Sequence, residues 1–111
     1  VAQFRKLYNT LEVKEGEWEP MLNLLAWTVK EGDAVKYVAL VYLREKHRPS
    51  HYFAEGDANI LLSPASVDMG GVFITPLEKD FNKLDAELVK VIFNELCLSA
   101  KDVEEIVNKI K

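Results

Sequence analysis

The sequence has few of the residues on which disulfide and metal chemistry depend. Its only cysteine is Cys97, so no disulfide can form within the chain, as is usual in reducing compartments. Its only histidines are His47 and His51, and Pro49 between them opposes the helix that would align them. No cysteine lies nearby to complete a zinc set with these histidines. We therefore expect a cytoplasmic protein with no bound metal and no cofactor.

Long apolar runs and an excess of basic charge are also absent. No uninterrupted apolar segment approaches the roughly 20 residues that a membrane-spanning helix needs. The chain has 14 Lys and Arg residues against 18 Asp and Glu, a net charge of −4. An acidic balance argues against a general binder of nucleic acid or anionic membranes. We expect neither nucleic acid nor a membrane as a partner.

The length and composition predict one folded domain. The 111 residues, 49% hydrophobic and 29% charged, are enough for one packed core and too few for two ordinary domains. No repeat, low-complexity tract or linker divides the chain. We expect a single domain over residues 1–111. Because the first residue is Val1 and not Met, we also expect this chain to be a piece of a longer polypeptide.

Hydrophobic patterns in the first two thirds of the chain predict one short helix and a small sheet. Apolar residues at helical spacing predict a helix over about residues 2–11. The apolar runs at 21–29 and 35–43 flank a Gly-Asp turn, which predicts a β-hairpin. Residues 69–75 predict a third strand, and they begin at a glycine pair, Gly70 and Gly71.

The last third of the sequence predicts helices. Thr75-Pro-Leu-Glu78 has the hydroxyl, proline and glutamate of a capping box at a helix N-terminus. Asp85 and Ser99 begin two further segments with apolar residues at helical spacing. The predicted fold class is α+β, a small antiparallel sheet with helices at its C-terminal end. Four aromatic residues are expected in the core: Trp18, Trp27, Tyr37 and Phe73.

A basic segment follows the most apolar run of the chain. The run Tyr37–Leu43 leads directly into Arg44-Glu-Lys-His-Arg-Pro-Ser-His51. If the strand continued, Arg44, Lys46 and Arg48 would share one face, where their donors could bind a phosphate. Charged residues at a strand end also prevent a sheet edge from pairing with other chains. The sequence leaves both interpretations open.

The glycine pair Gly70 and Gly71 is a second candidate feature. Paired glycines permit positive φ and let a ligand or another backbone come close. A bulge or the tight start of a strand accounts for such a pair as well. Cys97 falls within the apolar pattern of a helix and has no histidine placed to activate it, so we expect it to be inert packing.

Three segments resemble an uncharacterised bacterial protein family: Glu19-Pro-Met-Leu-Asn-Leu-Leu25, Arg44-Glu-Lys-His-Arg-Pro-Ser-His-Tyr-Phe53 and Ser63-Pro-Ala-Ser-Val-Asp-Met-Gly-Gly-Val-Phe-Ile-Thr-Pro76. That family looks like a branch of the histidine-triad superfamily, beside the dinucleoside tetraphosphate phosphorylases (ATP adenylyltransferases) and the GDP-hexose phosphorylases. The resemblance covers about Trp18 to Leu98. It implies that this chain is the C-terminal half of a histidine-triad-like fold.

The resemblance also implies a function. In such enzymes a histidine of a His-x-His-x-His/Gln motif attacks the α-phosphorus of a nucleotide, and His47 and His51 do not match that spacing. The nucleophile would lie in the upstream half of the same polypeptide. This chain would contribute sheet and phosphate-binding residues to a nucleotidyltransferase or phosphorylase that acts on a nucleotide or nucleotide-sugar. The expected binding residues are Asn23, Arg44, Lys46, His47, Arg48 and His51, with close backbone approach at Gly70 and Gly71; none is expected to be catalytic.

Two other functions are compatible with the sequence. The chain could be a non-catalytic nucleotide-binding or protein-interaction module, or a structural half-domain with no site of its own. A half-fold would leave apolar sheet surface uncovered, and large uncovered patches tend to be buried by association. We therefore also expect a homo-oligomer.

Overall fold

The computed structural model describes residues 1–111 and has a small α+β fold, which confirms the predicted fold class. Its only sheet is an antiparallel hairpin of β1 (Leu22–Glu31) and β2 (Ala34–Leu43), paired from Leu22↔Leu43 to Glu31↔Ala34. Gly32 has a φ of 63° at the first position of the two-residue turn. A hairpin turn of this length needs positive φ at that position, which glycine adopts without strain. The predicted hairpin is confirmed.

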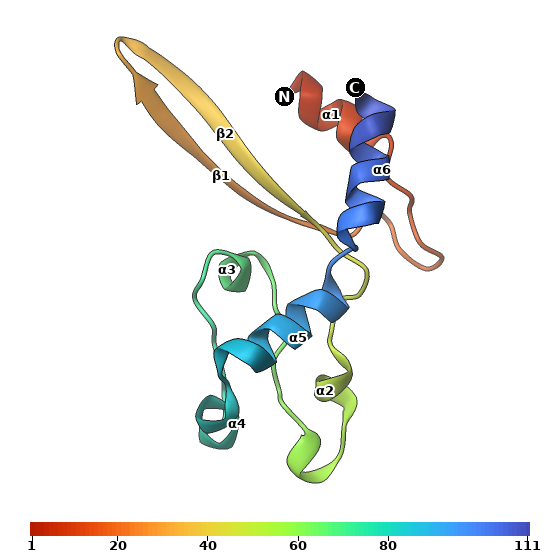
Figure 1. Ribbon diagram of the computed structural model, residues 1–111, viewed down its shortest axis with the longest axis vertical. Helices are drawn as coiled ribbons and strands as arrows, with labels where there is room; N and C mark the ends of the chain where they lie inside the picture. The colour runs from red at the N-terminus through yellow and green to blue at the C-terminus, as the bar shows by residue number, and fades with distance from the viewer.

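Helices make up most of the remaining chain. Their bounds are α1 (Ala2–Tyr8), α2 (Ser50–Phe53), the 3₁₀ turn η1 (Gly56–Ala58), α3 (Ser66–Met69), α4 (Glu78–Lys83), α5 (Ala86–Leu96) and α6 (Ala100–Ile110). Figure 1 shows the hairpin extending away from the body of the molecule, with α1 and α6 to one side and α2 to α5 below it. Helices α1 and α6 pack together near the two termini. None of the helices is long and apolar enough to cross a membrane.

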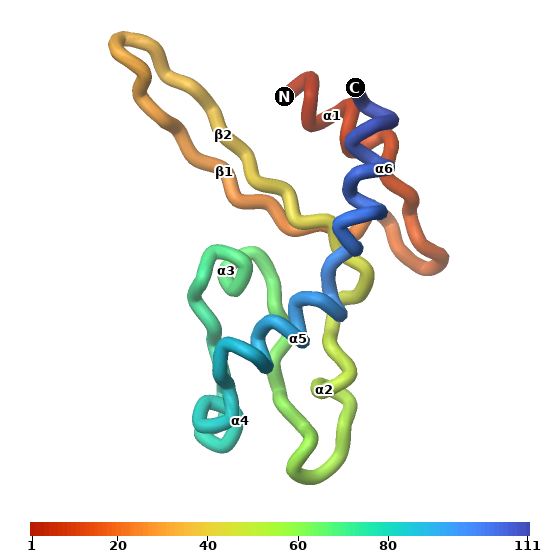
Figure 2. The backbone as a smooth tube through the Cα atoms, in the orientation of Figure 1, coloured from red at the N-terminus to blue at the C-terminus, as the bar shows by residue number.

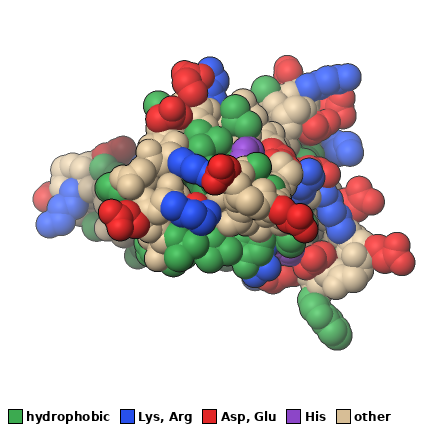
Figure 3. Space-filling view, turned by 90° about the horizontal axis from the view of Figure 1, so that it is seen from below, with side chains coloured by type: hydrophobic (Ala, Val, Ile, Leu, Met, Phe, Trp, Pro, Cys, Tyr) green, Lys and Arg blue, Asp and Glu red, His purple; other side chains and the backbone are tan.

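The core is small and lies against α5. Ile92 and Leu96 of α5 pack with Ile60 and Leu62, which belong to the segment between η1 and α3. That segment can be followed past α5 in Figure 2. Only 12 of the 111 residues are buried, so much of the apolar surface of this chain has no cover. Hydrophobic side chains also reach the surface among charged ones on the lower face (Figure 3).

The two longest helices begin where the sequence predicts. Asp85 precedes α5, and its carboxylate accepts a hydrogen bond from the backbone N–H of Leu88 at 2.8 Å. Ser99 precedes α6, and its hydroxyl accepts one from the N–H of Asp102 at 3.2 Å. Both side chains satisfy an N–H that has no partner inside its helix.

Two predicted features are wrong. Residues 69–75 form no strand, because no other strand lies beside them: Val72 and Ile74 are exposed while Phe73 packs on Phe93, with ring centroids 5.6 Å apart. The capping box at 75–78 is also not formed. Helix α4 begins at Glu78 and has no side-chain cap, and its first bonds run from the N–H groups of residues 80 and 81 to the carbonyl of Leu77.

Most of the aromatic residues expected in the core are exposed. The exposed fractions are 99% for Trp18, 84% for Tyr37 and 47% for Trp27, while Phe73 is half-buried as expected. Tyr37 and Trp27 lie on opposite faces of the hairpin, and neither face is covered along its outer part. The prediction failed for Tyr37 and Trp27 because a two-stranded sheet has no second layer here to bury them.

Candidate anion-binding site

The chain leaves β2 and forms a basic loop, residues 44–49, that borders an open cavity of about 690 Å³. We call this the basic cavity. It is lined by Asn23 of β1, by Arg44, Lys46, His47 and Arg48 of the basic loop, by Phe53 of α2, and by Ser63, Pro64 and Ala65. Five of the six predicted phosphate-binding residues therefore meet at one cavity; His51 does not line it.

Arg44 is buried, with 7% of its surface exposed, and it holds the basic loop in shape. Its Nε and Nη2 donate to the carbonyl of Lys46 at 3.2 and 2.9 Å, and Nη2 also donates to the carbonyl of His47 at 3.0 Å. Its Nη1 donates to the carbonyl of Pro64 at 2.8 Å and to Oδ1 of Asn23. A guanidinium has five N–H donors, so none is left for a ligand. Burial lowers the pKa of Arg44, and the nearby Cys97 and Asp68 oppose that shift.

The prediction that Arg44, Lys46 and Arg48 share one strand face is wrong. Strand β2 ends at Leu43, and Arg44 forms only an isolated bridge with Cys97. The N–H groups of Glu45 and Lys46 both donate to the carbonyl of Leu96, at 2.7 and 3.4 Å. The C-terminus of α5 thus supplies the acceptor that a neighbouring strand would have supplied, and it turns the chain out of the sheet.

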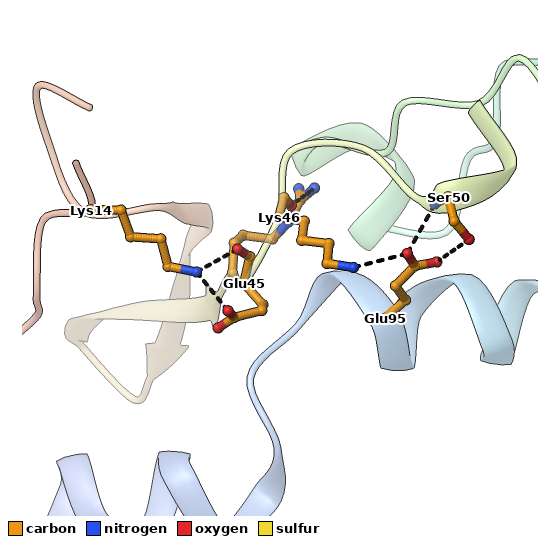
Figure 4. Close-up of polar contacts among 6 residues, drawn as sticks. Lys14, Glu45, Lys46, Ser50 and Glu95 are labelled. Atoms are coloured by element: carbon orange, nitrogen blue, oxygen red, sulfur yellow. Dashed lines mark hydrogen bonds and ion pairs between the residues drawn. The ribbon is translucent and has the colours of Figure 1, made fainter. Parts of the chain in front are cut away.

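Glu95 of α5 anchors the far end of the basic loop (Figure 4). Its carboxylate accepts from Nζ of Lys46 at 3.1 Å, from the N–H of Ser50 at 2.9 Å and from the hydroxyl of Ser50 at 3.1 Å. Burial acts to raise the pKa of Glu95, but these hydrogen bonds outweigh it and hold the pKa below its usual value. On the other side of the loop, Lys14 pairs with Glu45 at 2.7 Å.

The remaining cations of the loop differ in how they are paired. His47 lies 3.0 Å from a carboxylate oxygen of Glu17 and is 65% exposed. The guanidinium of Arg48 lies 4.3 Å from the centroid of the Tyr52 ring, a cation–π distance, and no carboxylate pairs with it. Arg48 is thus the exposed cation of the loop that is free to meet an anion.

Asn23 has a donor that the protein does not use. Because a guanidinium can only donate, the oxygen of the Asn23 amide must face Arg44, and this fixes the orientation of the amide. Its Nδ2 makes no hydrogen bond within the chain, although the side chain lines the basic cavity. Asn23 can therefore offer an N–H to a ligand in the cavity.

His51 and the glycine pair lie away from the cavity. His51 is half-buried in α2, and its Nδ1 is buried without a hydrogen-bond partner. Gly70 closes α3 by donating to the carbonyl of Ser66 at 3.0 Å. Gly71 has a φ of 100°, but a Cβ at that position would meet nothing within 4 Å. The positive φ explains why glycine stands at position 71, and no other group lies close to where a side chain would be.

Sequence reasoning missed two features of this region. The first is Phe53, which lines the basic cavity and is 70% exposed. The aromatic pair Tyr52 and Phe53 directly after the basic segment is the sequence signal that could have identified it. Asp80 is fully buried and accepts from the N–H of Leu61 at 2.9 Å and from Nζ of Lys79 at 2.6 Å. No sequence pattern marks a carboxylate whose partner is a backbone group 19 positions away.

The fold and the cavity define a small α+β chain with an open cavity lined by basic residues. Comparisons with family models, with curated proteins and with solved structures found no match to this chain. The resemblance to the histidine-triad superfamily therefore stays a prediction.

Proposed function

We propose that this chain is the phosphate-binding portion of a nucleotidyltransferase or phosphorylase that acts on a nucleotide or nucleotide-sugar. The observation that carries the proposal is the convergence of Asn23 with the basic loop at one cavity. The cavity gathers positive charge in a chain whose net charge is −4. On this proposal, Arg48 and Lys46 bind phosphate oxygens and the amide N–H of Asn23 adds a directed hydrogen bond.

The ion pairs already present in the loop do not prevent this role. Lys46 is 53% exposed in its pair with Glu95, and His47 is 65% exposed in its pair with Glu17. The cationic ends of both pairs are open to solvent, so a phosphate with two negative charges can compete with the carboxylates for the same cations. Arg44 keeps the loop backbone fixed, and a site that is already ordered loses less entropy when it binds.

The proposal assigns positioning and charge neutralisation to this chain, and the nucleophile to the upstream half of the same polypeptide. His47 has no second histidine at the spacing of the His-x-His-x-His/Gln motif, so this chain lacks the nucleophile that the resemblance implies. An in-line attack on phosphorus still depends on groups that hold and neutralise the phosphate oxygens. We expect the chain alone to show no nucleotidyl transfer and no phosphorolysis.

Isothermal titration calorimetry with inorganic tripolyphosphate tests the phosphate site. We expect weak binding that falls as salt rises, since screening weakens exposed charge pairs. The variant Arg48→Gln should bind at least about tenfold more weakly, because a hydrogen bond to a charged group contributes ~1.5–3 kcal/mol. Lys90→Gln is the matched control, an exposed lysine of α5 outside the cavity, and it should bind like the parent chain. No heat of binding at millimolar tripolyphosphate would overturn the proposal.

A second candidate is a protein-interaction module, which the hairpin supports. Tyr37, Val35 and Trp27 are large apolar residues with exposed fractions of 84%, 53% and 47% on a sheet with no second layer. On this proposal the hairpin binds the upstream half of the same polypeptide, and the basic loop is a solvated strand end. Mixing the chain with that upstream half and measuring a stable complex that is insensitive to Arg48→Gln would favour this candidate.

A further inference from the structure

We propose that Phe53 is a stacking platform for the base of the nucleotide whose phosphates the basic cavity holds. The proposal rests on the proposed function and deepens it, because it assigns the cavity to a ligand that carries an aromatic ring. The observation behind it is the placement of Phe53, which is 70% exposed and is the only Phe, Tyr or Trp side chain in a cavity wall that is otherwise mostly polar and cationic.

Phe53 lies where two cavities meet. It lines the basic cavity of about 690 Å³ and an adjoining cavity of about 390 Å³, and Lys46 and Arg48 line both of them. A ligand with phosphates at Arg48 therefore has an aromatic side chain in the wall of the same cavity. The larger volume falls in the range of about 300–1,000 Å³ that small-molecule sites occupy.

The Phe53 ring contacts the ring of Tyr52 and is otherwise open to a ligand. Tyr52 and Phe53 have ring centroids 5.2 Å apart at an interplanar angle of 71°, an edge-to-face pair. The guanidinium of Arg48 lies over the ring of Tyr52, 4.3 Å from its centroid. Of the two adjacent rings, Tyr52 therefore holds the cation and Phe53 keeps an open surface.

The chemistry of Phe53 also predicts how selective the site is. A phenyl ring has no hydrogen-bond donor or acceptor, so it binds any base through its π-face and reads none of the base edges. The site should therefore accept several nucleotides, and it should bind the larger purine ring more tightly than a pyrimidine.

Calorimetry that compares ATP with inorganic tripolyphosphate separates the base from the phosphates. We expect the chain to bind ATP about tenfold more tightly than tripolyphosphate, which is the scale of one base stacked on an aromatic side chain. The variant Phe53→Leu should bind the two ligands equally and keep the tripolyphosphate affinity of the parent chain. Phe53→Trp should keep the preference for ATP. The matched control is Phe81→Leu, because Phe81 is 69% exposed on α4 and lies outside the basic cavity.

Each outcome has a distinct meaning. Equal binding of ATP and tripolyphosphate by the parent chain, or an unchanged preference in Phe53→Leu, would overturn the stacking proposal and leave the phosphate site standing. Absence of binding for both ligands would overturn the proposed function, and the stacking proposal with it. If Phe81→Leu lost the preference for ATP over tripolyphosphate, the base would bind at another surface, and this result would also overturn the stacking proposal. Since Phe53 is exposed, its replacement by leucine should not change the fold, and circular dichroism checks this.

Discussion

Arg44 and Asp80 place full charges inside a chain that buries only 12 of its 111 residues. Each charged group has hydrogen-bond partners inside the fold. The guanidinium of Arg44 donates to carbonyl and amide oxygens. The carboxylate of Asp80 accepts from a backbone N–H and from an ammonium group. Such side chains connect segments that are distant in the sequence. Arg44 joins β1 to the segment at Pro64, and Asp80 joins α4 to Leu61.

Replacing Arg44 with lysine should destabilise the fold. An ammonium group has three donors in place of five and cannot span the same acceptors, so carbonyls of Lys46, His47 or Pro64 would be left unpaired. Each buried group left without a partner costs about 1–3 kcal/mol, so we expect a loss of roughly 2–4 kcal/mol in the free energy of unfolding. Urea denaturation measures it. Arg5→Lys, at an exposed position of α1, is the control, and equal midpoints for the two variants would contradict the prediction.

Asp80 should make stability depend on pH at the acidic end. The hydrogen bond from Lys79 is the main cause that holds the pKa of Asp80 below its usual value; burial opposes it, and the N–H of Leu61 adds to it. A carboxyl whose pKa is depressed in the folded state contributes stability above its unfolded pKa, about 3.9, and loses it as the pH falls through the folded pKa. We expect the free energy of unfolding to decrease as the pH falls below about 4.

The variant Asp80→Asn tests this origin of the pH dependence. It should be less stable at neutral pH, and the acidic decrease should be shallower, as measured by urea denaturation at a series of pH values. Asp33→Asn makes the same change of charge in the exposed hairpin turn and serves as control. A decrease of the same steepness in Asp80→Asn and in the parent chain would contradict the assignment to Asp80.

Helix α5 is the element on which the core depends. It carries two of the four buried residues of the core, Ile92 and Leu96, and its Glu95 anchors the basic loop. Its C-terminal carbonyl at Leu96 receives the chain that leaves β2. A change that frays α5 therefore affects both the core and the wall of the basic cavity.

Removing the N-cap of α5 should lower stability by about 1 kcal/mol, the usual cost of replacing an aspartate cap by alanine. In Asp85→Ala the N–H of Leu88 loses its acceptor. Asp85→Asn is the matched control, because asparagine caps helices about as well as aspartate does. Thermal unfolding followed by circular dichroism measures both, and a loss in Asp85→Asn as large as in Asp85→Ala would show that charge, rather than capping, is responsible.

The predicted elements that proved correct depend on local chemistry. The caps at Asp85 and Ser99 and the turn at Gly32 act on residues within three or four positions, so the sequence carries their signals. The third strand predicted at 69–75 failed because a strand needs a partner, and a short apolar run does not say whether one is present. The same limit applies to the candidate site. The basic residues could be identified from the sequence. The burial of the Arg44 guanidinium, however, depends on acceptor oxygens of Pro64 and Asn23, which are distant from it in the sequence.

The whole molecule is more extended than a compact domain. Its radius of gyration is 16.5 Å, against about 13 Å for a compact domain of 100 residues. The projecting hairpin accounts for this (Figure 1). Neither of its strands has a neighbour on the outer side, and β2 carries Lys36 as its only charged residue. A two-stranded sheet is marginally stable alone, and an edge with so little charge is poorly protected from pairing.

We expect two copies of this chain to associate through the hairpin. A second copy offers the same unpaired edges and apolar faces, which suits a two-fold symmetric contact. The double variant Trp27→Lys and Leu40→Lys places charge on one face of the hairpin and should shift the chain toward the monomer, as measured by light scattering. Val72→Lys with Ile74→Lys alters two exposed apolar residues elsewhere and should not. A monomer at high concentration of the parent chain would contradict the expectation.

The exposure of both tryptophans has an optical consequence. Trp18 and Trp27 are the only tryptophans of the chain, and neither is buried in the folded state. Indole emission shifts to longer wavelength as water surrounds the ring, so both side chains should already emit near the wavelength of an unfolded chain. Melting of the helical core would then change the emission little. Covering of the hairpin would move the emission of Trp27 to the blue, so the intrinsic fluorescence of this protein should report on what binds the hairpin more faithfully than on whether the core is folded.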